Sequence, residues 1–346
     1  MTGRIGFACK WIDTPEECAG RKPTSESRDL NGRSTTMRWL REHKSEAEQR
    51  QWDIMNHNAR AALLLVERVG SLPEHLRVGS LPPHLRMVRL GSEMLQGYTQ
   101  ADWQDWWQRQ EIQDHCAKIF APIGARAREL GVRLSFHPGQ FCVLASESDE
   151  IAERSIEEFE YHADMARWMG YGKTFQDFKI NVHISGRKGP AGIQSALKRL
   201  SPEARNCITI ENDEMTWGID ASLELAQDCA LVLDIHHHWI KTGEYIEATD
   251  DRIKRVIDSW RGVRPVIHYS VSREDVLTGH SRLQLPALVP LIESGHKKGK
   301  LRAHSDFFWN DAVNAWAFTH SSWSDIMCES KGKNLASQDF YRRATA

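Results

Sequence analysis

The chain has 346 residues, of which 40% are hydrophobic and 27% charged, and its formal net charge is −2. These values are ordinary for a soluble globular protein and exclude a generally basic surface, although a local basic groove remains compatible with them. No apolar run approaches the roughly 20 residues that span a bilayer. The first residues show no basic-then-apolar leader, so we expect a cytoplasmic protein with no membrane partner.

Short apolar runs alternate with helical patterns along the chain. Strands are expected at residues 4–9, 87–90, 132–136, 178–182, 207–210, 230–233, 265–267 and 325–328. Helices are expected from about residue 37 and over 51–68, 101–130, 149–169, 190–200, 220–228 and 247–260. This alternation implies βαβ units and a parallel sheet. Eight such units favour an α/β fold of the (β/α)₈ TIM-barrel type, built as a single domain over residues 1–346.

Three segments are expected as loop insertions in this domain, near residues 12–33, 69–86 and 271–320. The middle one is a tandem nonapeptide in which only Glu74 and Pro83 differ between the two copies. Nine residues with prolines cannot form a solenoid unit. We therefore interpret the repeat as a local duplication that lengthens one loop.

Ligand-type side chains stand at the ends of the expected strands, where TIM barrels build their active sites. A lone strand-end histidine is more often structural, but repetition at one mouth favours a metal site. Imidazoles and carboxylates without thiolates suit Zn²⁺, Mn²⁺ or Fe²⁺, and the seven scattered cysteines form no Cys-x-x-Cys motif. Eight ligands predict two or three divalent ions, as in two-metal phosphoester chemistry. The expected ligands are His137, His183, Glu211, Asp234, His237, His268, His304 and Glu329.

Two further pairs of residues lie near the same expected mouth. Gln140 and Phe141 follow His137 in a Pro-Gly turn, and this pair serves either in packing or as a wedge that enters a base stack. Lys331 and Lys333 follow the last strand, near the place where barrels often bind phosphate. Both pairs are candidate DNA contacts.

Several motifs, in this order, resemble those of the UV damage endonuclease family. That family has a (β/α)₈ barrel of the xylose-isomerase-like kind and is related in site design to endonuclease IV. The resemblance extends over about residues 4–334. The motifs are Ser135-Phe-His-Pro-Gly-Gln-Phe141, Asn181-Val-His183, Ile210-Glu-Asn-Asp-Glu214, Asp234-x-x-His237, Ile267-His-Tyr-Ser270 and Asp325-Ile-Met-Cys-Glu-Ser-Lys-Gly-Lys333.

The resemblance implies a metal-dependent endonuclease that nicks damaged double-stranded DNA immediately 5′ of cyclobutane pyrimidine dimers and 6-4 photoproducts, and often of abasic sites. It favours Mn²⁺, with Zn²⁺ and Fe²⁺ as alternatives. Glu211, Glu329 and His268 would act in catalysis through water held by the ions, and Gln140 and Phe141 would probe the duplex. By the same resemblance Glu211 bridges two ions, one also bound by His137 and His183 and the other by Asp234, His268 and Glu329, while His237 and His304 hold a third.

The chain departs from the family pattern at a few positions. Relatives can carry a lysine two residues before the strand-seven histidine, where this chain has Val266, so a modified lysine there is absent. Relatives can have Tyr and Asn near the end of the first strand, where this chain has Phe7 and Trp11, so Phe7 is expected to retain the aromatic stacking on DNA. Phe141 replaces a frequent Tyr. Glu93, after the second strand, is considered as an extra ligand or DNA contact.

Two other functions remain open on the sequence. One is a metal-dependent sugar isomerase or epimerase on the same barrel, because fold alone does not separate these activities. The other is a lesion-binding protein without catalysis. No motif for a protein partner is visible.

Overall fold

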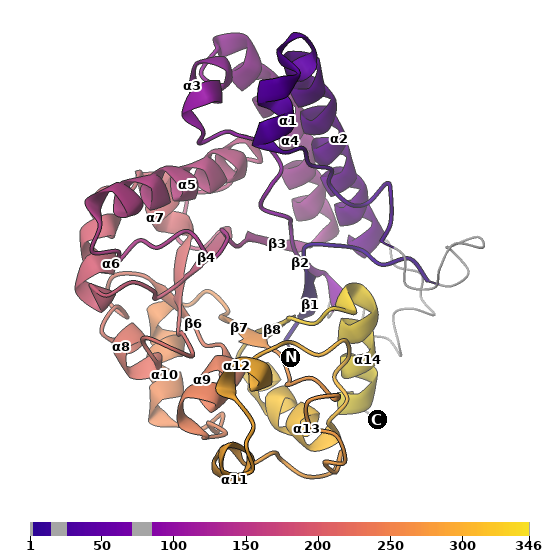
Figure 1. Ribbon diagram of the computed structural model, residues 1–346, viewed down its shortest axis with the longest axis vertical. Coiled ribbons are helices and arrows are strands. Elements are labelled where there is room, and N and C mark those ends of the chain that lie inside the picture. Colours follow the sequence, from indigo (N-terminus) through magenta and orange to yellow (C-terminus); the bar gives the residue numbers. More distant parts are fainter. Residues whose placement is uncertain (1–2, 15–25, 71–84, 346) are drawn as a thin grey trace.

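The computed structural model describes residues 3–14, 26–70 and 85–345. Its eight parallel strands form one sheet in the order β6-β5-β4-β3-β2-β1-β8-β7. The sheet closes between β6 and β7 through a parallel bridge of Asp234 with His268, whose amide donates to the carbonyl of Leu233 at 3.0 Å. The predicted (β/α)₈ barrel is therefore confirmed (Figure 1). The strands are β1 (Ile5–Ala8), β2 (Met87–Arg89), β3 (Arg133–Phe136), β4 (Lys179–His183), β5 (Ile208–Glu211), β6 (Ala230–Val232), β7 (Val266–Tyr269) and β8 (Asp325–Cys328).

Helices surround the strands on the outside of the barrel (Figure 1). They follow the strands as the alternating pattern predicts, although several are shorter than expected. The helices are α1 (Met37–Glu42), α2 (Lys44–Gly70), α3 (Ala101–Trp107), α4 (Gln110–Leu130), α5 (Asp149–Trp168), α6 (Gly189–Leu197), α7 (Pro202–Cys207), α8 (Ile219–Leu223), α9 (Ile235–Thr242), α10 (Asp251–Ser259), α11 (Leu288–Glu293), α12 (Lys298–Leu301), α13 (Asp311–Thr319), the 3₁₀ turn η2 (His320–Ser322) and α14 (Lys333–Thr345).

The single helix expected over 101–130 is wrong, because the chain forms α3 and α4 there. Arg109 takes an extended conformation with φ −60° and ψ 132°, which ends the helical hydrogen-bond ladder. The Gln113 side chain then donates to the Trp107 carbonyl at 2.7 Å and satisfies one group freed by the break. The break turns α3 away from the axis of α4, as Figure 1 shows.

The structure describes the three expected loop insertions to different extents. Residues 271–320 contain α11, α12 and α13 and are not a plain loop. The segment 12–33 is described except for residues 15–25, and most of the tandem repeat, residues 71–84, lies outside the described residues.

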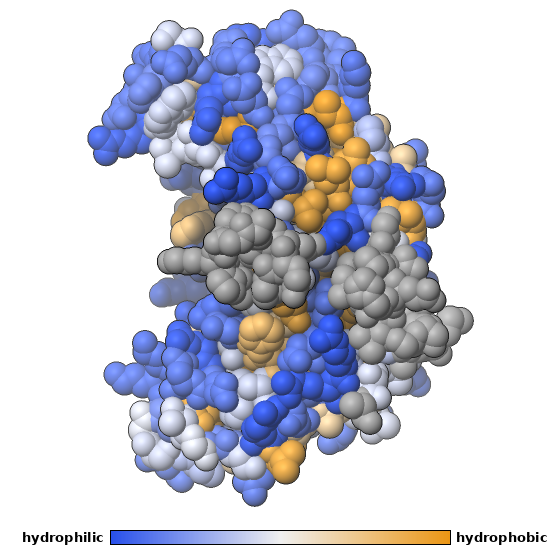
Figure 2. All heavy atoms as spheres, turned by 90° about the vertical axis from the view of Figure 1, so that its right-hand side faces the viewer, coloured by the Kyte–Doolittle hydropathy of each residue, from blue (hydrophilic) through white to orange (hydrophobic). Residues whose placement is uncertain are grey.

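The outer surface of the molecule is mostly hydrophilic on the face drawn in Figure 2, where apolar side chains form separate small groups. Across the described ranges, none of the helices combines the length and apolar character that crossing a membrane would need.

Gly124 permits close packing of α4 against the end of α5. A methyl group at this position would lie 1.9 Å from the Met169 carbonyl oxygen, which belongs to rigid backbone. We expect Gly124→Ala to lower the free energy of unfolding by about 3 kcal/mol, because overpacking in a dense core costs roughly this much. Urea titration followed by circular dichroism measures the change. Gly299→Ala is the control, since nothing lies within 4 Å of a methyl group there, and equal midpoints for the two variants would contradict the prediction.

Candidate metal centre

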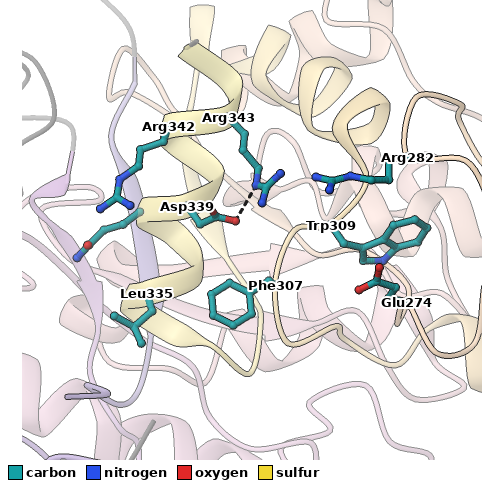
Figure 3. Close-up of a pocket in the computed structure, with 9 residues that line it drawn as sticks. Glu274, Arg282, Phe307, Trp309, Leu335, Asp339, Arg342 and Arg343 are labelled. Carbon is teal, nitrogen blue, oxygen red and sulfur yellow. Dashed lines mark hydrogen bonds and ion pairs between the residues drawn. The ribbon is translucent and has the colours of Figure 1, made fainter. Parts of the chain in front are cut away.

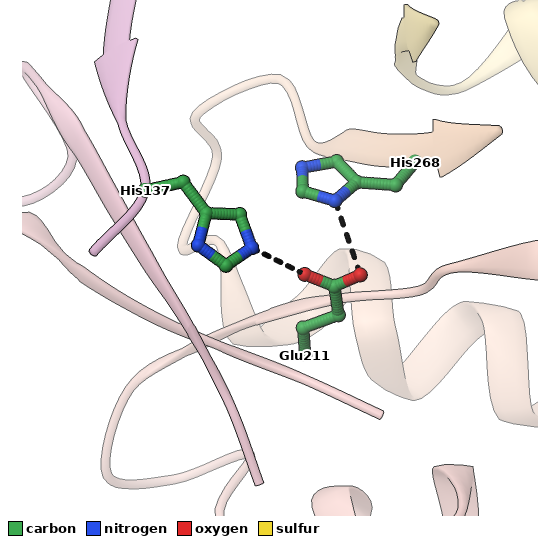
Figure 4. Close-up of side chains that lie close together, drawn as sticks. All are labelled: His137, Glu211 and His268. Carbon is green, nitrogen blue, oxygen red and sulfur yellow. Dashed lines mark ion pairs between the residues drawn. The ribbon is translucent and has the colours of Figure 1, made fainter. Parts of the chain in front are cut away.

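Glu211 lies at the centre of the barrel mouth, at the carboxyl end of β5, and is fully buried. Four imidazoles surround its carboxylate. The Oε1 atom lies 3.1 Å from His268 Nδ1 and 3.5 Å from His237 Nδ1. The Oε2 atom lies 3.4 Å from His137 Nε2 and 3.8 Å from His183 Nε2. Figure 4 shows His137 and His268 approaching the two oxygens from different strands.

The candidate ligands form three overlapping groups, each with its ligand atoms within 4.8 Å of one another. Seven of the eight residues expected from the sequence belong to them, and Glu211 and His268 are shared between groups. His304 lies at the edge, with Nε2 3.9 Å from Glu329 Oε2. The groups are His137 with Glu211 and His268, His183 with Glu211 and His237, and Asp234 with His268 and Glu329.

Hydrogen bonding in the cluster fits divalent cations. Glu211 Oε1, Asp234 Oδ2 and His268 Nδ1 are buried and make no hydrogen bond within the described ranges. Glu211 Oε1 and His268 Nδ1 instead face each other as an ion pair at 3.1 Å. Buried polar atoms are almost always hydrogen-bonded, so ligand-type atoms grouped here without hydrogen bonds fit a site that would hold a metal ion. His137 Nδ1 donates to the Pro138 carbonyl at 2.8 Å. That bond leaves Nε2, which faces Glu211, as the ligand nitrogen of the neutral ring.

Protonation of the imidazoles favours the same interpretation. Burial lowers the pKa of His268 to about 4 and also lowers the pKa of His137, so both rings are neutral at pH 7 and can bind metal. Burial also acts to lower the pKa of His237, but Asp234 and Glu211 outweigh it and raise that pKa to about 9. Metal binding there would therefore displace a proton.

Asp234 is both a helix cap and a candidate ligand. Its Oδ1 accepts hydrogen bonds from the amides of His236 and His237, each at 2.7 Å, and so starts α9. Its Oδ2 remains directed at the cluster, 3.7 Å from His237 Nε2. The Asn212 side chain exchanges two hydrogen bonds with the Asp234 backbone and ties the end of β5 to the end of β6.

Supporting residues inside the barrel were missed by the sequence analysis. Asn181 in β4 donates to Glu211 Oε2 and accepts from Thr209 Oγ1 at 2.7 Å. Arg89 in β2 forms an ion pair with Glu329. These contacts fix the orientation of two candidate metal ligands. The signal in β4 was its period of two, because Lys179, Asn181 and the predicted ligand at the strand end alternate with apolar residues.

Lys179 also reaches the cluster. Its Nζ lies 2.9 Å from His268 Nε2, and the side chain is buried. Val266, two residues before His268, packs in an apolar cluster with Ala8 and Met327. The amine near His268 therefore comes from β4.

We expect Lys179→Met to stabilise the metal-free protein at pH 7. Burial is the main cause that lowers the pKa of Lys179 to about 7, from 10.5 in an unfolded chain. The unfolded chain thus binds more protons between these values, so this residue destabilises the wild type most at and below pH 7, and less as pH rises. Urea unfolding from pH 6.5 to 9.5 should show a gain of about 1–4 kcal/mol at the acidic end that shrinks toward the alkaline end. A difference independent of pH would contradict this origin.

The Gln140–Phe141 pair forms the tip of a tight turn beside the cluster. The Cys142 amide donates to the Gly139 carbonyl at 2.9 Å, so both residues are central in the turn. The turn is anchored where Cys142 is buried and where the Val143 amide binds Ser155 Oγ at 2.8 Å. Phe141 is 85% exposed, more than any other large hydrophobic side chain in the described part of the chain.

The other expected DNA contacts are placed differently. Phe7 is only 4% exposed, and its ring packs edge-on against Trp11 at 5.8 Å, so the expectation that Phe7 stacks on DNA does not fit this structure. Lys331 is on the surface, with Nζ 3.4 Å from Asp306. Lys333 begins α14 and is half-buried.

Two cavities of different character lie near these elements. One, of about 1170 Å³, opens beside the metal cluster and is lined by His137, Gln140, Phe141 and Glu93. Glu93 is exposed there and belongs to none of the candidate metal groups.

The other cavity, of about 490 Å³, lies along α14 and is drawn in Figure 3. Arg282 and Arg343, two of its lining residues, pair with Asp311 at 3.2 and 3.4 Å. Arg343 also pairs with Asp339 at 2.8 Å. Asp311 and Asp339 thus balance the charges of these two arginines locally.

Fold and site together define a (β/α)₈ barrel with a histidine–carboxylate cluster at the carboxyl ends of its strands. Comparison with known proteins identifies the family of this barrel. Residues 30–342 match the model of the family described as UV-endonuclease UvdE. The chain belongs to this family.

Individual relatives agree with this assignment. The chain is 30% identical over 187 residues to a UV DNA damage endonuclease of Bacillus velezensis, an alignment that covers 50% of this chain and 57% of the relative. It is 28% identical over 184 residues to a UV-damage endonuclease of Neurospora crassa, covering 48% of this chain and 28% of the relative. The crystal structure of SacUVDE superimposes with a TM-score of 0.68 at 21% identity, covering 99% of this chain and 96% of that one, and shows the shared fold.

Proposed function

We propose that this protein is a metal-dependent endonuclease that cuts duplex DNA immediately 5′ of ultraviolet photoproducts, and also at abasic sites. The observation that carries the proposal is the buried Glu211 carboxylate with four imidazoles within 3.8 Å. Membership in the UV-endonuclease family supports DNA as the substrate.

The predicted ligand set would hold two or three divalent ions, with Mn²⁺ favoured. Ions bound there would supply Lewis acidity toward a phosphodiester and an activated water molecule. Glu211 is the shared ligand at the centre, and Asn181 holds its carboxylate in one orientation. Arg89 does the same for Glu329. The proposed ligands are His137, His183, Glu211, Asp234, His237, His268, His304 and Glu329.

Lesion recognition is assigned to the Gly139–Cys142 turn. Gln140 and Phe141 enter the base stack at the damaged step, where stacking is already poor and extrusion costs less. The adjoining cavity of about 1170 Å³ exceeds the volume of a typical small-ligand pocket and leaves room for an extruded nucleotide. Lys331 and Lys333 lie after β8, where they contact phosphates. The protein then selects a lesion because the damaged step of the duplex deforms easily, and it does not need to read the base sequence.

A duplex with one pyrimidine dimer and a labelled 5′ end tests the reaction. In the presence of Mn²⁺ we expect one product, which ends at the phosphodiester 5′ of the dimer, and no cutting of the undamaged duplex. Equal cutting of both duplexes would contradict the proposal. Binding without cutting would favour a lesion-binding protein, and ketose–aldose turnover without DNA binding would favour a sugar isomerase or epimerase.

A further inference from the structure

A basic segment lies at the barrel mouth and takes no part in the metal cluster. Lys297, Lys298, Lys300 and Arg302 fall within six positions around α12, in the long connection between β7 and β8. The protein as a whole carries a net charge of −2, so this cluster is a local exception. It immediately precedes the candidate ligand His304.

The segment is firmly attached to the rim of the barrel. Leu301 is fully buried, and its carbonyl accepts a hydrogen bond from Ser272 Oγ at 2.6 Å, just after β7. Ser272 also pairs with His304 in a short antiparallel bridge. Lys298 Nζ donates to the carbonyl of Lys241, at the end of α9, at 3.3 Å. Figure 1 shows α12 beside the labels of β7 and β8.

The lysines of this segment have no acidic partners of their own. Arg302 pairs with Glu214 at 2.7 Å. Over the described ranges, no carboxylate lies within ion-pair distance of Lys297, Lys298 or Lys300 in this segment. The same is true of Lys241, which lies near the end of α9. Lys297 and Lys300 are exposed. Lys241 Nζ donates to the Thr216 carbonyl at 3.0 Å, so Lys241 and Lys298 are held by carbonyl groups that do not neutralise their charge. Cations without acidic partners, held close together on a fixed rim, attract a polyanion.

The position of the segment relative to the Gln140–Phe141 turn follows from the barrel topology. The turn follows β3 and the basic segment follows β7. These strands are four places apart in the eight-stranded sheet, so they stand on opposite sides of the barrel. A duplex centred on Glu211 would meet the turn on one side of the mouth and the lysines on the other.

We propose that Lys241, Lys297, Lys298 and Lys300, the lysine rim, bind the phosphate backbone of duplex DNA on the side of the mouth opposite the Gln140–Phe141 turn. The inference rests on the proposed function. Phosphate contacts position a duplex without reading its sequence. Each contact releases counterions and adds about 0.9 to the slope of log affinity against log salt concentration.

The test removes three charges by Lys297→Ala, Lys298→Ala and Lys300→Ala in one variant. Fluorescence anisotropy with a photoproduct duplex between 50 and 200 mM salt measures affinity, and single-turnover nicking with Mn²⁺ at saturating DNA measures the cutting rate. We expect binding at least about tenfold weaker at 50 mM salt and a salt slope smaller by about 2.7, because three contacts of about 0.9 each are lost. The cutting rate at saturation should remain within twofold of wild type.

A matched control removes three exposed lysines elsewhere by Lys173→Ala, Lys198→Ala and Lys254→Ala, and should leave affinity and slope unchanged. An unchanged slope in the rim variant, or an equal loss in the control, would overturn the inference. DNA binding does not require cutting. A wild-type protein that binds DNA but never nicks it would contradict the proposed function alone. The salt slope of the rim variant would still test the lysine rim. A wild type without DNA binding overturns both.

Discussion

Glu211→Gln is expected to reduce Mn²⁺-dependent nicking of a photoproduct duplex by at least about 10³-fold, the upper range for losing one buried electrostatic contact in an active site. The substitution keeps the shape of the side chain but removes a charge that faces four imidazoles. Single-turnover rates measure the effect. Isothermal titration should show fewer Mn²⁺ ions bound per chain, while duplex binding persists.

Glu214→Gln is the matched control for this prediction. Glu214 lies three residues beyond Glu211, in the loop after β5, where it pairs with Arg302 at 2.7 Å and lies 3.7 Å from His237 Nε2. We expect it to lose less than about tenfold, as for a residue that supports a metal site without binding the ion. Equal losses in the two variants would show that the acidic loop as a whole matters, and full activity of Glu211→Gln would contradict the metal centre.

Gln140→Ala with Phe141→Ala is expected to slow nicking of the same duplex by about 100-fold. Stacking of a base on an aromatic side chain contributes about 1–3 kcal/mol, and the amide adds a contact at the same step. The fold should be unaffected, because Phe141 is 85% exposed. The measurement is the single-turnover rate on a fully paired duplex and on one with unpaired bases opposite the dimer.

The loss should shrink on the second substrate, because its damaged step is already open. Leu283→Ala provides the control, since Leu283 is also apolar and 78% exposed but lies in the connection between β7 and β8. The same loss on both substrates would mean that the turn contributes affinity without opening the duplex.

The barrel and most of the candidate ligand cluster could be predicted because six of the eight strand runs, those of β3 to β8, end in or run directly into a residue of ligand type. Strand ends converge by topology, so Glu211, His137 and His268 meet although they are distant in sequence. Arg89 and Asn181 could not be found in this way. Asn181 depends on the period of two in β4, which a rule based on strand ends does not use, and the three residues of β2 are too few to show such a period for Arg89.

Other differences have local causes. The short helices α11, α12 and α13 have four to nine residues, too few turns for a clear apolar period. The start of α9 depends on Asp234 acting as an N-cap, while its sequence pattern indicated a ligand. Burial of Phe7 depends on packing against Trp11, a tertiary contact that composition does not reveal.

Metal ions held around Glu211 are expected to drive cutting beside the lesion. The most direct test is to strip the protein of metal with a chelator, remove the chelator, and measure nicking of the single-dimer duplex during Mn²⁺ titration. The metal-free protein should not cut, and activity should return as Mn²⁺ is restored, with a break immediately 5′ of the dimer. Cutting at the wild-type rate in excess chelator would contradict the claim.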